Sequence, residues 1–81
     1  MSIRVLFFAS LADVTGVREV EVDSGVHSDV GSIFSAFVAK FPQLEAHRRS
    51  LLYAVNSEFV PASSAVHDGD EVAFFPPVSG G

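Results

Sequence analysis

The feature that most constrains this 81-residue chain is a single amphipathic helix, predicted over residues 29–41, among segments with strand-like patterns. Its apolar residues recur at the 3.6-residue period of a helix and therefore form one stripe. Ser28 or Asp29 can cap its start, and Pro42 ends it. Because this is the one clear helix, a sheet has to bury the stripe. The stripe consists of Val30, Ile33, Phe34, Phe37, Val38 and Phe41.

Four segments carry the patterns of β-strands, two before the helix and two after it. The first is a short run of β-favouring apolar residues. The second alternates valine with glutamate, which is typical of a half-buried strand. The order strand, strand, helix, strand, strand predicts an α+β roll, with one mixed sheet packed on one main helix. The strands are expected at residues 3–9, 18–23, 51–56 and 71–75.

The connections between these elements are predicted to be irregular. Residues 11–17 are expected to form a short helical turn or a loop, and residues 43–50 a polar connection that can hold another turn. Residues 59–64 are irregular around a proline, with at most a short edge strand. Residues 68–70, Asp-Gly-Asp, predict a tight turn because glycine tolerates a positive φ.

Both faces of the predicted sheet carry apolar side chains. Alternate residues of the first strand can face the helix, and Leu6 and Phe8 then point to the opposite face. A sheet covered on one side is normally polar on the other. The surplus therefore has two interpretations. It is either an exposed apolar surface of the kind that marks protein interfaces, or the irregular segments near Leu11 and Leu44 cover it.

The composition excludes several kinds of chemistry. The chain has no cysteine, which removes disulfides, cysteine-ligated metals and a thiol nucleophile. Its net charge is −5 and its five cations form no stripe, so nucleic acid is not an expected partner. An acidic domain instead favours a partner with a basic surface. The first apolar run contains Arg4 and is too short for a signal sequence or a membrane span, so we expect a cytoplasmic protein that does not bind membranes.

No internal group of residues predicts an active site. His27, His47 and His67 lie in predicted loops without close metal-ligand spacing, so no metal site is expected. The chain has no Gly-x-Ser-x-Gly elbow, no phosphate-binding loop and no dinucleotide fingerprint. Turn chemistry explains Asp68 and Asp70 better than cation binding does. We therefore expect a domain that is not an enzyme on its own and binds no cofactor tightly.

The most distinctive chemical group of the sequence is its chain end. Two prolines follow the last predicted strand and favour a stiff, extended exit from the domain. Gly80 and Gly81 lack a Cβ, so they can enter a slot too narrow for other residues. We predict a folded domain over residues 1–75 and a flexible tail over residues 76–81, with the α-carboxylate of Gly81 as the working group. An ordinary frayed terminus is the alternative.

Three stretches of this sequence carry a specific resemblance: Val5–Ala9, Ala54–Asn56 and Asp68–Gly81. They are similar to the small sulfur-carrier subunit of molybdopterin synthase. The terminal stretch, which ends in Pro-Pro-Val-Ser-Gly-Gly, is the specific one, and the resemblance covers the whole chain. It implies a ubiquitin-like β-grasp fold with an extended C-terminal tail. The chain departs from these relatives at Ala62-Ser63-Ser64, which lacks an acidic residue, and at His67.

The resemblance further implies a transferable sulfur at the chain end. An adenylating partner related to ubiquitin-activating enzymes would use ATP to activate Gly81, and a sulfurtransferase system would convert it to a thiocarboxylate. The tail would then enter the large subunit of the synthase. There it would donate sulfur to cyclic pyranopterin monophosphate and form the dithiolene of molybdopterin. In this family, two small subunits flank a dimer of large subunits.

The resemblance assigns roles to residues at both ends of the chain. Gly81 is implied to carry the sulfur, and Gly80 to provide clearance. Two other interpretations remain open. One is a carrier or ubiquitin-like modifier of another pathway, such as thiamine synthesis or protein conjugation, although Pro-Pro-Val-Ser argues against the thiamine type. The other is a passive β-grasp interaction module. The residues implied to bind partners are Phe75, Pro76, Pro77, Val78, Ser79, Leu6 and Phe8.

Overall fold

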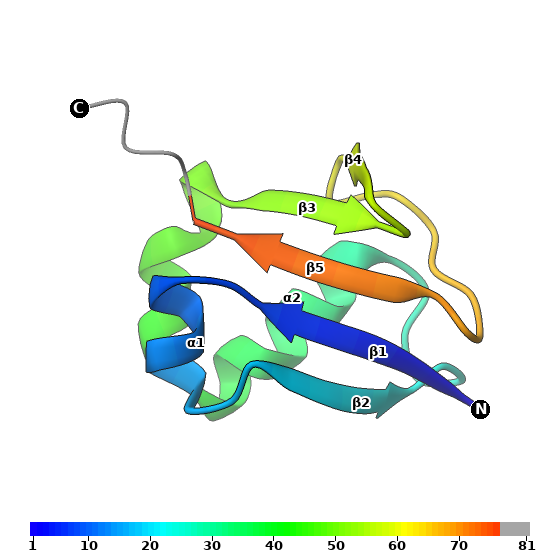
Figure 1. Cartoon of the computed structure of the whole chain (residues 1–81), viewed down its shortest axis with the longest axis horizontal. Helices are drawn as coiled ribbons and strands as arrows, with labels where there is room; N and C mark the ends of the chain where they lie inside the picture. The colour runs from blue at the N-terminus through cyan, green and yellow to red at the C-terminus, as the bar shows by residue number, and fades with distance from the viewer. Residues whose placement is uncertain (77–81) are drawn as a thin grey trace.

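Five strands form one mixed sheet in the computed structural model, which describes residues 1–76 (Figure 1). The sheet order is β2-β1-β5-β3-β4. The central pair, β1 and β5, is parallel, and every other neighbouring pair is antiparallel. The α+β roll predicted from the sequence is therefore confirmed. The strands are β1 (Ser2–Phe7), β2 (Glu19–Asp23), β3 (Leu52–Val55), β4 (Glu58–Val60) and β5 (Glu71–Phe75).

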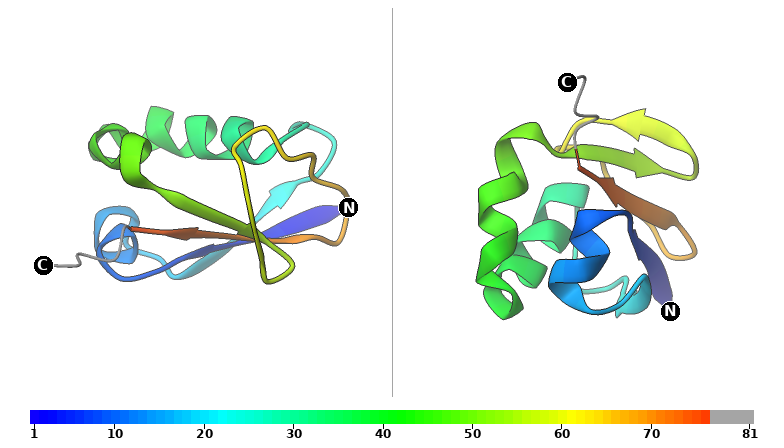
Figure 2. Two further views of the ribbon diagram at one scale, coloured as in Figure 1. Left: turned by 90° about the horizontal axis from the view of Figure 1, so that it is seen from above. Right: turned by 60° about the vertical axis from the view of Figure 1, so that its left-hand side comes forward.

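The helical elements leave one face of the sheet uncovered. The main helix α2 (Val30–Lys40) and the 3-10 helix η1 (Pro42–Ser50) lie on one face, as the left view of Figure 2 shows. The short helix α1 (Ser10–Thr15) lies at the end of the sheet where β1 finishes. The opposite face of the sheet, called the outer face below, is turned toward the viewer in Figure 1.

Phe74 on β5 lies at the centre of the core. Its ring centroid is 5.3 Å from that of Phe34 on α2 and 5.6 Å from that of Phe7 on β1. Leu11 and Leu44, from α1 and η1, are fully buried in the same core. The two irregular connections therefore help to fill the core under the sheet. Of the two interpretations of the surplus apolar residues, the structure favours the exposed surface.

Several elements begin or end one residue away from their predicted bounds, and two differ more from the sequence prediction. β1 ends at Phe7, whereas the prediction extended it to Ala9. The chain turns there because Ala9 has a φ of 52° and leads directly into α1. The segment predicted as a polar connection at 43–50 forms the 3-10 helix η1, which is anchored by the buried Leu44.

The start of α2 is fixed by a capping box. The side chain of Asp29 accepts a hydrogen bond from the backbone N–H of Ser32 at 2.8 Å, and Ser32 Oγ accepts one from the backbone N–H of Asp29 at 3.4 Å. This pairing satisfies N–H groups that a helix start leaves without intrahelical partners. Of the two predicted caps, Asp29 is the one the structure uses.

Gly31 allows another segment to cross α2 closely. Its N–H donates to the carbonyl of Ala62 at 2.8 Å, and a Cβ at this position would lie 3.2 Å from the same oxygen. A glycine in a helix costs about 1 kcal/mol relative to alanine. Because Gly31 has no Cβ, the segment before β5 can pack closely on the first turn of α2.

A hydrogen-bond network fastens the β3–β4 turn to the turn before β5. The side-chain amide of Asn56 donates to Asp70 Oδ1 at 3.0 Å, and Asn56 Oδ1 accepts from the backbone N–H of Glu71 at 3.0 Å. The backbone N–H of His67 donates to Asp70 Oδ2 at 2.8 Å. The two hydrogen bonds that Asp70 accepts lower the pKa of its carboxyl, and the bond from Asn56 has the larger effect.

The lowered pKa predicts an acid-sensitive contribution to stability. The charged Asp70 carboxylate stabilises the folded state. This stabilisation is complete above the unfolded pKa of 3.8 and is lost as pH falls through the lower pKa of the folded state. We expect Asp70→Asn to lower the free energy of unfolding at neutral pH by about 1–2 kcal/mol. As pH falls below 3.8 and through the lower folded pKa, the parent and the variant should converge. Denaturant titrations at both pH values measure this, with Asp13→Asn as an exposed control. A loss of equal size at both pH values would contradict the prediction.

Candidate functional site

Apolar side chains gather on the outer face around the end of β5. Phe59 is 72% exposed, Phe8 41% and Leu52 40%. Residues in register on neighbouring strands share a face of the sheet, so the pairs Leu6–Ala73 and Leu52–Phe75 bring these side chains together. We call this set the apolar surface. It consists of Leu6, Phe8, Leu52, Phe59, Ala73 and Phe75.

Phe75 is the centre of the apolar surface. Its ring stacks on that of Phe8, with centroids 4.5 Å apart and planes 15° apart. On the other side it lies 5.9 Å from the ring of Phe59. Phe75 is half-buried and ends β5, and Pro76 follows it as the last described residue. The apolar surface therefore surrounds the point at which the chain end leaves the sheet.

The structure brings together three of the residues implied by the family resemblance: Leu6, Phe8 and Phe75. Pro76 follows them directly and is half-buried. The remaining implied residues lie outside the part of the chain that the structure describes, so their roles stay predictions. These are Pro77, Val78, Ser79, Gly80 and Gly81.

Three members of the apolar surface are not among the site residues predicted from the sequence: Leu52, Phe59 and Ala73. Leu52 and Phe59 come from β3 and β4, and Phe59 is in register with Ala54 of β3. The alternation along residues 51–55 places Leu52 opposite the core-facing residues, so a signal for it existed. Phe59 offered no comparable signal, because its position depends on β4 pairing next to β3.

A shallow hollow of about 700 Å³ borders the apolar surface where β1 passes into α1. It is open on one side, and both apolar and charged side chains contribute to its wall. A partner that covers the apolar surface can extend a side chain into it. Residues that line it include Leu6, Phe8, Ala9, Asp13, Arg18 and Glu19.

Ala9 holds Phe8 in place through a strained backbone. Its φ of 52° and ψ of −128° belong to a region that glycine normally occupies. On either side the chain is tied down: the N–H of Phe8 donates to the carbonyl of Phe74 at 3.2 Å, and the N–H of Ala12 donates to that of Ala9 at 3.0 Å. The turn at Ala9 therefore positions Phe8 beside Phe75.

Replacing this strained alanine with glycine should stabilise the fold. Ala9→Gly removes strain of about 1–3 kcal/mol and adds an entropic cost of about 0.5–1 kcal/mol. A net gain of about 1 kcal/mol in the free energy of unfolding is expected. The same substitution at the exposed Ala36 of α2 should instead cost about 1 kcal/mol. Chemical denaturation of both variants tests the pair, and losses at both positions would show that Ala9 is unstrained.

The other half of the outer face is charged. The Arg4 guanidinium lies 3.4 Å from the Glu19 carboxylate and 3.1 Å from the Glu71 carboxylate. These pairs are exposed, so they contribute little to stability. Glu21 and Asp23 extend the row of carboxylates along β2. The outer face thus divides into the apolar surface and an acidic half along β2.

Shifted pKa values occur away from the apolar surface. The hydrogen bond to Glu45 raises the pKa of Arg48, and burial raises the pKa of Tyr53. The Arg48 guanidinium also lies 5.2 Å from the centre of the Phe34 ring. The contact between Arg48 and Phe34 supports the packing of η1 against α2. Within residues 1–76, no cluster of three or more potential metal ligands occurs, and no helix is long and apolar enough to cross a membrane.

Comparison with known proteins places the chain in a family. The model of the ThiS family matches residues 5–81, nearly the whole sequence. The chain belongs to the ThiS family. The molybdopterin synthase sulfur carrier subunit of Mycobacterium tuberculosis is 39% identical, covering 100% of this chain and 99% of that relative. Small archaeal modifier protein 1 of Haloferax volcanii is 40% identical, covering 91% and 94%.

A solved structure agrees with the architecture described above. The crystal structure of SAMP1 from Haloferax volcanii superposes with a TM-score of 0.80 at 35% identity and covers 100% of both chains. The ubiquitin-like β-grasp fold expected from the sequence is therefore confirmed. The resemblance to sulfur-carrier subunits is confirmed as well, since relatives with that name match over their full length.

Proposed function

We propose that this ThiS-family chain is the sulfur-carrier subunit of a molybdopterin synthase, with Gly81 as the residue that carries sulfur. The observation that carries the proposal is the full-length similarity to a molybdopterin synthase sulfur carrier subunit, at 39% identity. The composition supports it, because the chain has no cysteine on which sulfur could be held. The chain is then a sulfur donor to the synthase and depends on its partners for catalysis.

The chemistry takes place at the Gly81 carboxylate. A carboxylate is a poor acyl donor because oxide is a poor leaving group. An adenylating partner therefore joins it to the α-phosphate of ATP and releases pyrophosphate. A nucleophilic sulfur supplied by a sulfurtransferase system attacks the acyl carbon, AMP leaves, and a thiocarboxylate remains. In the large subunit the thiocarboxylate sulfur bonds to a carbon of cyclic pyranopterin monophosphate. Water then hydrolyses the bond between this sulfur and the acyl carbon of Gly81, which leaves the sulfur on the pterin and restores the carboxylate. Because a dithiolene holds two sulfurs, two loaded chains are needed for each pterin.

The apolar surface is the docking site in this proposal. The adenylating partner and the large subunit both have to hold the domain while the chain end lies in their active sites. Exposed aromatic residues clustered at one place are typical centres of protein interfaces. Phe8, Phe59 and Phe75 form such a cluster at the base of the chain end. The same surface can therefore serve successive partners.

Intact-mass measurement tests the proposal. Incubation with ATP, an adenylating enzyme and a sulfur source should raise the mass by about 16 Da, because sulfur replaces one oxygen of a carboxylate. The loaded chain should then convert cyclic pyranopterin monophosphate only when the large subunit is present. A loaded chain that supports no conversion would move the function to another pathway. A mass that never changes would rule out a sulfur carrier.

A protein modifier is the second candidate function. It is favoured by the 40% identity to small archaeal modifier protein 1. A modifier would form an amide bond between Gly81 and an amine of a target protein. Mass spectrometry of tryptic digests from the native cells would then find Gly81 attached to lysine side chains of other proteins. Digests in which Gly81 occurs only as carboxylate or thiocarboxylate favour the carrier.

A further inference from the structure

The edge of the sheet formed by β2 is open. Within residues 1–76, β2 has one neighbouring strand, β1, and no strand pairs with its other side (Figure 1). The backbone N–H of Phe7 donates to the carbonyl of Arg18, and that of Ser24 to the carbonyl of Met1. In an antiparallel pair the hydrogen-bonded positions alternate, so Val20 and Val22 bond to β1. The backbone groups of Glu19 and Glu21 consequently point outward.

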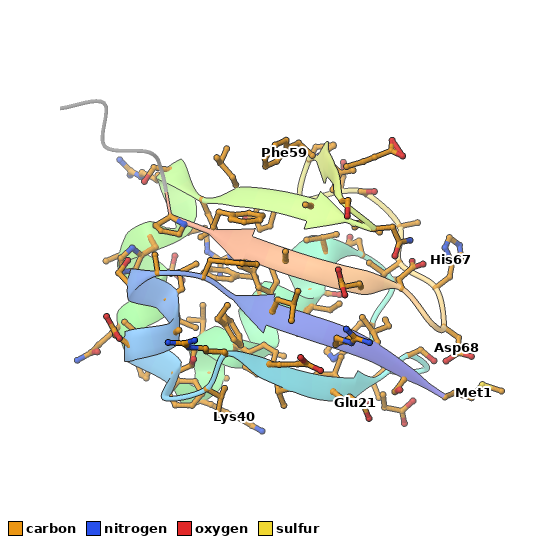
Figure 3. All side chains as sticks on the ribbon, in the orientation of Figure 1. Met1, Glu21, Lys40, Phe59, His67 and Asp68 are labelled. Carbon is orange, nitrogen blue, oxygen red and sulfur yellow. The ribbon has the colours of Figure 1, made fainter. Side chains whose placement is uncertain are left out.

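The opposite edge of the sheet is much less able to accept a strand. β4 has three residues, and Pro61 follows it immediately. Short strands and prolines are common ways in which proteins block an edge. β2 has five residues, contains no proline and keeps an unbroken register with β1. Of the two edges in the described part of the sheet, β2 is therefore the one that offers a regular row of backbone donors and acceptors. Figure 3 shows Glu21 and Phe59 at these two opposite edges.

We propose that the free edge of β2 binds an extended segment of a partner protein, in which lysine or arginine alternates with aliphatic residues. The backbone groups of Glu19 and Glu21 would pair with the segment as in a β-sheet. Side chains opposite Glu19, Glu21 and Asp23 lie on the outer face beside three carboxylates, which select basic residues. The intervening side chains lie beside the half-buried Val20 and Val22 and are therefore aliphatic.

Charge argues against a second copy of this chain as the occupant. Two β2 strands paired antiparallel about Glu21 would place Glu21 opposite Glu21, and Glu19 opposite Asp23. Like charges directly opposite each other destabilise a strand pair. The Arg4 guanidinium offsets only part of this charge, since it is shared between Glu19 and Glu71. A basic segment from another protein removes the repulsion and gains an attraction instead.

A designed peptide tests the proposal on the full chain. The probe is acetyl-Lys-Val-Arg-Val-Lys-Val-Lys-amide, and its control has the same composition with the four basic residues contiguous. In titrations followed by amide NMR, we expect saturable binding of the alternating peptide, with the largest shifts at Glu19 and Glu21. Hydrogen exchange of these two amides should slow. The contiguous peptide should bind more weakly and without protecting them.

Matched charge variants separate strand pairing from general attraction. Glu21→Lys should weaken binding about tenfold, because it replaces an attractive cross-strand pair with a repulsive one. Glu58→Lys on β4 changes the net charge equally and should leave the affinity nearly unchanged. If Glu21→Lys does not fold, Glu21→Gln replaces it in the same binding measurement and should also weaken binding, because it removes the attractive charge. Equal losses at both glutamates, equal binding of both peptides, or self-association of the chain through β2 would overturn the proposal.

Discussion

Deleting Gly81 is expected to abolish sulfur transfer and to leave the melting temperature unchanged. In the proposed mechanism the reacting carbon belongs to this residue, so the deletion moves the carboxylate back by one residue along the chain. One residue spans about 3.3 Å, whereas reacting atoms must approach within about 3–3.5 Å. Within residues 1–76, Phe74 is the last buried core residue, so we expect the fold not to depend on Gly81.

Adding one residue after Gly81 should have the same effect, for a different reason. The new residue would have to occupy the position at which only glycine fits, and its carboxylate would extend beyond the reacting groups. A one-residue extension before Met1, which is 91% exposed, is the matched control and should retain activity. The assay is the loading of sulfur, measured as intact mass, followed by conversion of the pterin precursor. Full activity of the deletion would show that Gly81 is not the residue that carries the sulfur.

Local sequence patterns were enough to predict which face of a strand or helix each residue lies on. The alternation along β5 placed Phe74 and Phe75 on opposite faces, and the helical period of α2 placed Phe34 in the core; both placements depend only on neighbouring residues. Asp29 was predictable as a cap for the same reason, since its partner Ser32 lies in the same helical turn.

Long-range pairing and backbone strain were not predictable in this way. Phe59 joins the apolar surface because β4 pairs with β3, and β3 with β5. No residue near Phe59 encodes that order. The end of β1 was also misplaced, because an alanine carries no signal for a φ of 52°; the contacts of Phe8 and Leu11 on either side impose it at Ala9. The site was therefore anticipated around Phe75 but not in its full extent.

Replacing Phe74 with alanine is expected to reduce mainly stability, whereas replacing Phe75 is expected to reduce mainly partner affinity. Phe74 is fully buried against Phe7 and Phe34, so Phe74→Ala should lower the free energy of unfolding by about 3–5 kcal/mol. A domain of this size has little stability in reserve, and the variant should be largely unfolded at moderate temperature. Thermal denaturation followed by circular dichroism measures the loss.

Phe75→Ala should retain the fold and lose partner affinity. The half-buried Phe75 ring stacks on Phe8, so its removal costs about 0.5–1.5 kcal/mol of stability through the lost aromatic pair. As the centre of the proposed docking site, it should contribute about 1–3 kcal/mol to binding of the large subunit. Calorimetry with the large subunit, at a temperature where the variant is folded, separates the two effects. Unchanged affinity would remove Phe75 from the interface. A stability loss as large as that of Phe74→Ala would mean that Phe75 belongs to the core, because only a core ring leaves a cavity of that cost.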